Sequence, residues 1–156
     1  MAAGSVTLYD FVAKYLLGGS IDLNTDTVKL ALVASTYTPD QVNHDLWGDV
    51  SANEITGGGT TGYTTGGYTL LTPVFTAVTK GYKFSSANPS WTAGAATLGA
   101  WRYGVLYVSG TVDGYVSPLI GYFLGDSTPA DVPATTDTNT LTITVPAGGW
   151  FDLTRP

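Results

Sequence analysis

The sequence predicts a mainly β domain, an antiparallel β-sandwich or a barrel-like domain with one short N-terminal helix. Apolar and polar residues alternate over many short segments, and this period of two is typical of half-buried strands. The 20 glycines and 8 prolines separate these segments at short intervals, as turn residues do. A single segment has instead the three- and four-residue spacing of a helix. A chain of 156 residues has the length of one domain, so we expect residues 1–156 to fold together.

The predicted helix spans Thr7–Leu17. Its apolar side chains recur at intervals of three and four residues, at Leu8, Phe11, Val12, Tyr15 and Leu16. Asp10 lies in the first turn, where a carboxylate interacts favourably with the helix dipole, and Gly18-Gly19 provides a stop. We expect Ser5 or Thr7 to cap the helix.

Residues 1–6 are uncharged and precede a helix that is too short to be stable alone. Segments of this kind often become ordered only on a partner. We therefore expect residues 1–6 to form an extended arm that serves attachment or oligomer contacts and not the domain's own core.

The predicted strands are short and follow one another along most of the chain. The segment 140–145 alternates Thr with apolar residues, and we expect it to lie centrally in a sheet or beside a central strand. The segment 102–108 is apolar on both sides and predicts a strand buried on both faces. Asp113-Gly114 predicts a two-residue hairpin turn. Further strands are expected at 27–33, 68–71, 74–78, 82–84 and 118–124, a long loop at 128–138, and a turn or short helix at 41–50.

The composition argues against several classes of protein. Charged residues make up 12% of the chain, about half the usual share, and the net charge is −6. A chain with so few cations has no basic stripe to neutralise phosphates, so no nucleic acid partner is expected. The absence of Cys excludes disulfides and thiolate metal sites. No apolar run approaches the roughly 20 residues of a membrane span, and we expect neither a signal peptide nor a membrane partner.

The carboxylates are the first candidates for chemistry, since paired carboxylates hydrolyse glycosides. The candidates are Asp22, Asp26, Asp45, Asp49 and Glu54. We expect Asp22 and Asp26 to make turn hydrogen bonds instead. Together with Asn24 they have the alternate spacing of a calcium loop, but its glycine and final glutamate are missing, so no metal site is predicted.

The single His and a glycine-rich segment are two further candidates for a functional site. His44 is the single His and stands beside Asp45, but sequence neighbours seldom orient each other, and we expect a surface or hydrogen-bonded His. The segment Thr56–Thr69 contains only Gly, Thr and Tyr. A phosphate-binding loop needs a strand before it, a helix after it and usually a Lys, so we predict a flexible surface loop. The chain is expected to have no catalytic residue and no cofactor, and not to be an enzyme.

The aromatic residues have two interpretations. The four tryptophans, Trp47, Trp91, Trp101 and Trp150, with 10 Tyr, are suited to a sugar-binding platform. They are equally suited to the core and to interfaces with protein. For the second interpretation the candidate interface residues are Val6, Leu8, Trp47, Tyr63, Tyr68 and Trp91.

Several stretches, in order along the chain, resemble small virion structural proteins of tailed bacteriophages. They are Ser5–Asp10, Leu17–Leu23, Asp26–Val33, Tyr37–Asp40, Glu54, Gly62–Gly67, Ala100–Tyr107 and Ser117–Tyr122. The chain departs from the pattern at Asp126–Thr138 and at Gly148–Pro156.

The resemblance implies a non-enzymatic virion component that is made in the host cytoplasm and is present in many copies. The role that the resemblance favours is that of a capsid decoration or cement protein, which lies on the outer capsid surface and bridges subunits of the major capsid protein. Such a protein is expected to be a homo-oligomer, with a trimer among the options. A tail, head-fibre or connector component has the same composition, and a carbohydrate-binding adhesin is the alternative from another class.

Overall fold

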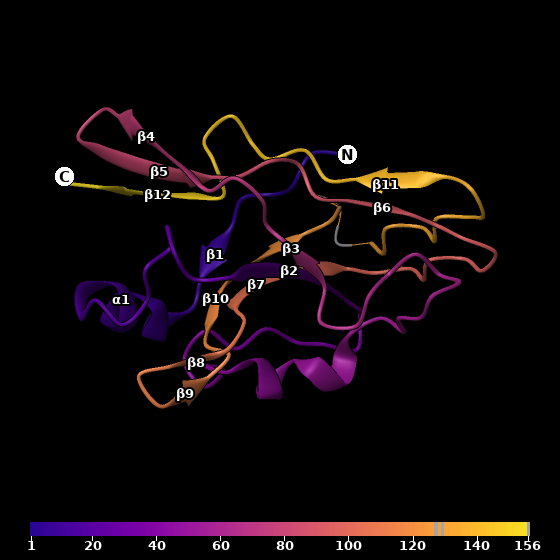
Figure 1. Ribbon diagram of the computed structural model, residues 1–156, viewed down its shortest axis with the longest axis horizontal. Helices are drawn as coiled ribbons and strands as arrows, with labels where there is room; N and C mark the ends of the chain where they lie inside the picture. Colours follow the sequence, from indigo (N-terminus) through magenta and orange to yellow (C-terminus); the bar gives the residue numbers. More distant parts are fainter. Residues whose placement is uncertain (127, 129, 156) are drawn as a thin grey trace.

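A five-stranded antiparallel sheet forms the centre of the fold (Figure 1). The computed structural model describes residues 1–126, 128 and 130–155. In the order of the sheet, the strands are β1 (Thr7–Leu8), β10 (Leu119–Leu124), β7 (Tyr103–Val108), β2 (Val28–Val33) and β3 (Tyr68–Thr69). The fold is mainly β, with antiparallel sheets and one α-helix in the described part of the chain, which confirms the predicted fold class.

Smaller antiparallel sheets surround the central one. A three-stranded sheet has the order β12 (Phe151–Thr154), β5 (Gly81–Ser85), β4 (Val74–Val78). A second pair joins β6 (Ser90–Thr92) to β11 (Thr140–Thr142), and a third joins β8 (Thr111–Val112) to β9 (Tyr115–Val116). The turn of this last hairpin is Asp113-Gly114, with φ values of 50° and 84°, the positive values that a two-residue hairpin favours.

The core lies on both sides of the central sheet because β2 and β7 bury both of their faces. Leu30 and Leu106 pack into the larger cluster, with Phe84, Trp91, Leu141 and Phe151 of the surrounding strands. Val33 and Val105 point to the other face and pack with Tyr9, Tyr37 and Val50. The prediction that 102–108 is buried on both faces is confirmed. Two layers of strands around the larger cluster give the fold its sandwich-like character.

The helix α1 (Asp10–Leu17) begins later than predicted. Thr7 and Leu8 are extended and pair with Tyr122 and Gly121 in the central sheet. Tyr9 is therefore the N-cap residue and makes no side-chain cap hydrogen bond, so the predicted caps Ser5 and Thr7 are wrong. A short 3₁₀ helix, Trp47–Asp49, lies within 41–50, where a turn or short helix was predicted, and a second one, Ser51–Asn53, follows it. No helix among the described residues is long and apolar enough to cross a membrane.

The segment 140–145 does not lie in the central sheet. Only Thr140–Thr142 form a strand, and its partner is β6. Leu141 and Ile143 are buried while Thr140 and Thr144 are exposed. Alternation of polar and apolar residues indicates that one face of a strand is buried and the other exposed, as in a peripheral strand. A central strand that is covered on both faces is apolar on both sides and does not alternate.

Residues 1–6 are extended but lie on their own domain. The backbone N–H of Ala3 donates to the carbonyl of Thr144 at 3.0 Å, and the N–H of Thr144 donates to the carbonyl of Met1 at 2.6 Å. The Met1 amino group donates to the carbonyl of Thr142 at 2.8 Å, and Val6 packs against the core. The expectation that this arm stands apart from the core is therefore wrong, because its backbone continues the edge beyond β11.

Deletion of residues 1–6 tests this placement. The loss of these backbone hydrogen bonds and of the Val6 contact is expected to lower the free energy of unfolding by about 2 kcal/mol. For a domain of this size, the melting temperature then falls by roughly 4–8 °C. The measurement is thermal unfolding followed by circular dichroism, and an unchanged melting temperature would show that the arm does not belong to the fold.

Candidate functional site

The His44 side chain is held by the hydroxyl of the buried Tyr37 and by the backbone N–H of Asp40, and not by Asp45. The hydroxyl of Tyr37 lies 2.9 Å from Nδ1 of His44, and the hydroxyls of Tyr9 and Tyr37 lie 2.7 Å apart. The His44 ring stacks on Tyr37, with 5.5 Å between centroids. Burial raises the pKa of Tyr9 and of Tyr37. This polar chain fixes the loop that carries His44 to the central sheet, in agreement with the expected hydrogen-bonded His.

The aspartates make local turns, as predicted for two of them. Asp22 accepts the N–H of Asn24 at 2.9 Å, and this hydrogen bond lowers the pKa of the Asp22 carboxyl. Asp26 accepts the N–H of Asp22 at 2.8 Å. Asp49 accepts the N–H of Leu46 at 3.0 Å at the start of the 3₁₀ helix. Among the described residues, no group of three or more His, Cys, Asp or Glu side chains lies close enough to hold a metal ion.

Glu54, the single glutamate of the chain, anchors the glycine-rich segment. One carboxylate oxygen accepts both the hydroxyl of Tyr63 and the N–H of Gly66, each at 2.7 Å. The Tyr63 hydroxyl in turn accepts the N–H of Leu32 in β2 at 3.0 Å. Tyr63 is 1% exposed, so the predicted surface loop is tied into the core at its middle, while Gly58, Gly59 and Gly62 stay at the surface.

The end of the same segment packs closely against β7 and β2 of the central sheet. The hydroxyl of Tyr107 donates to the carbonyl of Gly66 at 2.6 Å. Gly67 has a φ of +79°, and a Cβ there would lie 2.2 Å from the carbonyl oxygen of Leu30. Glycine at this position therefore serves close backbone approach.

The tryptophans are used inside the molecule. Trp91, Trp101 and Trp150 are 4%, 0% and 2% exposed. Trp47 is half-buried and stacks on Tyr107, with 4.5 Å between centroids and 6° between ring planes. The sugar-binding platform considered from the sequence is therefore not present as an exposed row of Trp side chains in the described structure.

The candidate interface residues do not form one exposed surface. Tyr63 and Trp91 are buried in the core, so the structure removes them from the set. Tyr68 is half-buried and packs edge-on against Trp91. Val6 and Leu8 are partly buried against the core, and Trp47 is covered by its stack on Tyr107. Aromatic residues are enriched in cores and interfaces alike, so residue type alone did not separate the two.

A different surface is exposed and apolar: one face of the sheet β12-β5-β4, which we call the outer face. Strand register places two apolar rows on it, Phe75, Phe84 and Phe151 in the first and Ala77, Tyr82 and Leu153 in the second. Phe84 and Phe151 are buried, but Phe75, Tyr82 and Leu153 are 43%, 62% and 56% exposed. In Figure 1 these strands lie at the margin of the molecule, away from the central sheet.

The outer face carries no charge, whereas the opposite face of the same sheet does. Thr76, Lys83 and Asp152 form a row on that opposite face. The sequence contains a signal for this arrangement in β5 and β12, where Lys83 stands between Tyr82 and Phe84, and Asp152 between Phe151 and Leu153. The signal shows which side is apolar but not that the second apolar row extends beyond the core.

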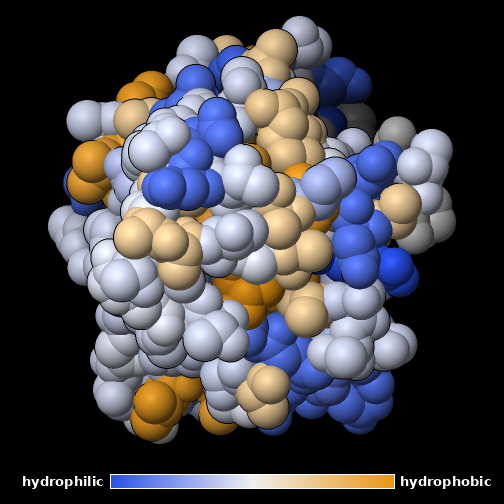
Figure 2. Space-filling view, turned by 90° about the vertical axis from the view of Figure 1, so that its right-hand side faces the viewer, coloured by the Kyte–Doolittle hydropathy of each residue, from blue (hydrophilic) through white to orange (hydrophobic). Residues whose placement is uncertain are grey.

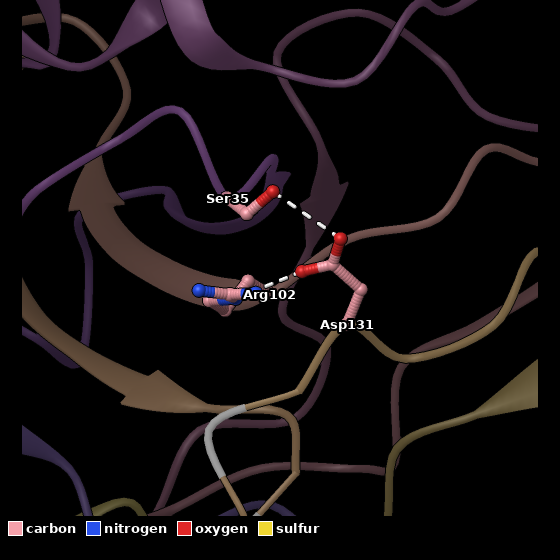
Figure 3. Close-up of polar contacts among 3 residues, drawn as sticks. All are labelled: Ser35, Arg102 and Asp131. Carbon is pink, nitrogen blue, oxygen red and sulfur yellow. Dashed lines mark hydrogen bonds and ion pairs between the residues drawn. The ribbon is translucent and has the colours of Figure 1, made fainter.

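The segment 126–138 is fastened to the central sheet, in its described residues. Asp131 accepts the Nε–H of Arg102 at 2.8 Å and the hydroxyl of Ser35 at 3.2 Å, and Figure 3 shows its carboxylate between the two. Backbone bridges also pair Val132 with Trp101 and Thr135 with Leu98. The long loop predicted at 128–138 thus pairs, in its described residues, with the segment that leads into the central strand β7, and Pro129 lies outside the described residues.

The end of the molecule that carries β6 and β11 has a different surface. Figure 2 shows this face, on which pale residues of intermediate hydropathy predominate and apolar residues occur in small separate groups.

Comparison of the chain with protein-family models, curated protein sequences and solved structures gives no match.

The role of Glu54 as an anchor predicts a loss of stability in Glu54→Ala. This change leaves the Tyr63 hydroxyl and the Gly66 N–H without their acceptor, at an expected cost of about 3 kcal/mol in the free energy of unfolding. Glu54→Gln keeps an acceptor oxygen and is the matched control, with an expected cost of about 1 kcal/mol or less. Urea unfolding measures both, and equal stability of the two variants would contradict the anchor.

The buried tyrosines predict unfolding at alkaline pH. Burial raises the pKa of Tyr107 to about 12 and also raises the pKa values of Tyr9 and Tyr63. In the unfolded chain a tyrosine ionises near pH 10, so the unfolded state releases these protons first and is favoured as the pH rises. The stability contributed by these groups is present below about pH 10 and falls above it, by up to about 1.4 kcal/mol per pH unit for each tyrosine.

Melting temperature and tyrosinate absorbance, recorded together from about pH 8 to about pH 12, check this expectation. The melting temperature is expected to be flat at first and to fall once the tyrosines of the unfolded chain ionise. Complete tyrosine ionisation in the folded protein near pH 10 would contradict it.

Proposed function

We propose that the chain is a non-enzymatic structural protein of a tailed-bacteriophage virion, which decorates the capsid and bridges subunits of the major capsid protein. The single observation that carries this proposal is the uncharged, exposed outer face of the sheet β12-β5-β4. Contiguous exposed apolar surface on a domain with an ordinary core marks a site of contact with another molecule.

The chemistry of the outer face selects its partner. Tyr82 and Leu153 offer large apolar area, and the three strands place no charged residue on that face, so we expect the surface that binds there to be mainly apolar. A net charge of −6 opposes a polyphosphate partner. An assembled protein shell supplies such a surface in many identical copies, and a protein that binds only the assembled shell stabilises it by mass action.

The hydrogen-bonded polar side chains inside the fold support the same proposal. Glu54, His44 and the buried tyrosines make hydrogen bonds that attach loops to the central sheet. A scaffold that withstands assembly on a particle needs such attachments. The carbohydrate-binding adhesin is not proposed, because three of the four tryptophans lie in the core.

The stoichiometry in purified virions tests the position. A copy number near that of the major capsid protein is expected for a decoration protein. A handful of copies per particle would contradict decoration and assign the chain to the connector, tail or head fibres.

The contact itself is tested with Leu153→Asp, which places a charge in the outer face. Desolvation of the new carboxylate against an apolar partner is expected to weaken binding to particles that lack the protein by at least about tenfold, equivalent to about 1.4 kcal/mol. Val116→Asp is the matched control, since Val116 is 62% exposed on the distant β8–β9 hairpin. Co-sedimentation with particles measures both variants, and equal binding would contradict the proposed contact.

A further inference from the structure

Strand β4 is an open sheet edge. Among the described strands it pairs only with β5, and Val74, Phe75, Thr76 and Ala77 are exposed. Natural edge strands are usually protected by a charge, a proline, a bulge or a covering segment. Val74–Val78 contains neither charge nor proline, and its register with β5 runs without a shift. The edge therefore has the properties of a strand that pairs with another strand.

The hairpin geometry shows which backbone groups are available. Val78 and Gly81 flank the two-residue turn Thr79-Lys80, so they form a hydrogen-bonded pair. Because hydrogen-bonded and non-hydrogen-bonded pairs alternate, the N–H and C=O groups of Val74 and Thr76 also point toward β5. Those of Phe75 and Ala77 point outward, to the open edge.

The sequence of β4 is self-complementary for antiparallel pairing. With Thr76 on a two-fold axis, Phe75 of one copy faces Ala77 of the other, and Val74 faces Val78. The outward groups of Phe75 and Ala77 then form the hydrogen-bonded pairs, while the two Thr76 residues form a non-hydrogen-bonded pair. Every cross-strand pair is uncharged, and Thr–Thr pairs are favourable.

We propose that two copies of the chain associate through antiparallel pairing of their β4 strands, with Thr76 at the two-fold axis. The two three-stranded sheets then form one six-stranded sheet, and their outer faces join into one apolar surface. The other edge of the sheet is less suited to this role, because β12 carries Asp152 within the strand, whereas β4 has no charged residue within Val74–Val78. The association concerns the isolated protein and does not depend on the proposed virion function.

Disulfide crosslinking tests the register, since the chain has no Cys of its own. In a non-hydrogen-bonded antiparallel pair the Cα atoms lie about 4.5 Å apart, within the range that a disulfide spans. Thr76→Cys is therefore expected to form a disulfide-linked dimer under mild oxidation. Val74→Cys, on the same side of the same strand, is the matched control. Its two copies would lie four residues out of register, about 14 Å apart, beyond the reach of a disulfide.

Efficient crosslinking of Thr76→Cys with little crosslinking of Val74→Cys supports the proposal. Equal crosslinking of both variants, or none of Thr76→Cys, overturns it. Thr111→Cys, on the exposed β8 strand, reports random collision and is expected to remain monomeric.

Sedimentation equilibrium provides a measurement without a crosslink. The unaltered protein is expected to show a concentration-dependent mass that rises from 16.2 kDa toward twice that value. Thr76→Glu places two like charges opposite each other at the axis and is expected to weaken the dimer at least about tenfold. Thr76→Gln has similar size without charge and is expected to retain it. A monomer at every concentration, or equal masses for the Glu and Gln variants, overturns the proposal, and circular dichroism verifies that each variant is folded.

Discussion

Burial of both faces of β2 and β7 is the constraint on which the rest of the structure depends. These neighbouring strands pair over their full length, from Val28 with Val108 to Val33 with Tyr103. A strand covered on both faces needs two separate sets of covering residues. The outer strands supply one set and the segment that contains Tyr37 and Val50 supplies the other. The chain therefore covers the central sheet on both faces.

Few charges are available to hold the covers in place, so tyrosine hydroxyls take this role. Tyr63 connects Glu54 to the backbone of β2, and Tyr107 reaches from β7 to the glycine-rich segment. On the opposite cover, Tyr9 and Tyr37 connect the start of the helix to His44. A tyrosine spans the distance between layers with an apolar ring and ends in a single polar group. In a water-poor interior such hydrogen bonds are strong, and their groups are costly to leave unpaired.

The sheet β12-β5-β4, here called the outer sheet, leaves several large apolar side chains exposed. Its first apolar row is inserted into the core through Phe84 and Phe151, and its second row, with Tyr82 and Leu153, extends into solvent. A small sheet of this kind is stabilised by additional strands or by packing on its free face. The edge and the face of the outer sheet are separate surfaces, so pairing of two copies through β4 leaves the outer face free to contact a shell.

The sequence by itself determined the class of fold, the hairpin at Asp113-Gly114 and the strands with a strong apolar pattern, because these depend on neighbouring residues. Tertiary structure decided the rest. The helix begins at Asp10 because Thr7 and Leu8 pair with β10, more than a hundred residues away in the chain. The alternation at 140–145 recorded one-sided burial but not its place in the fold. The residue type of an aromatic side chain does not indicate whether it lies in the core or at the surface. Only tertiary packing therefore buries Tyr63 and Trp91 and leaves Tyr82 exposed.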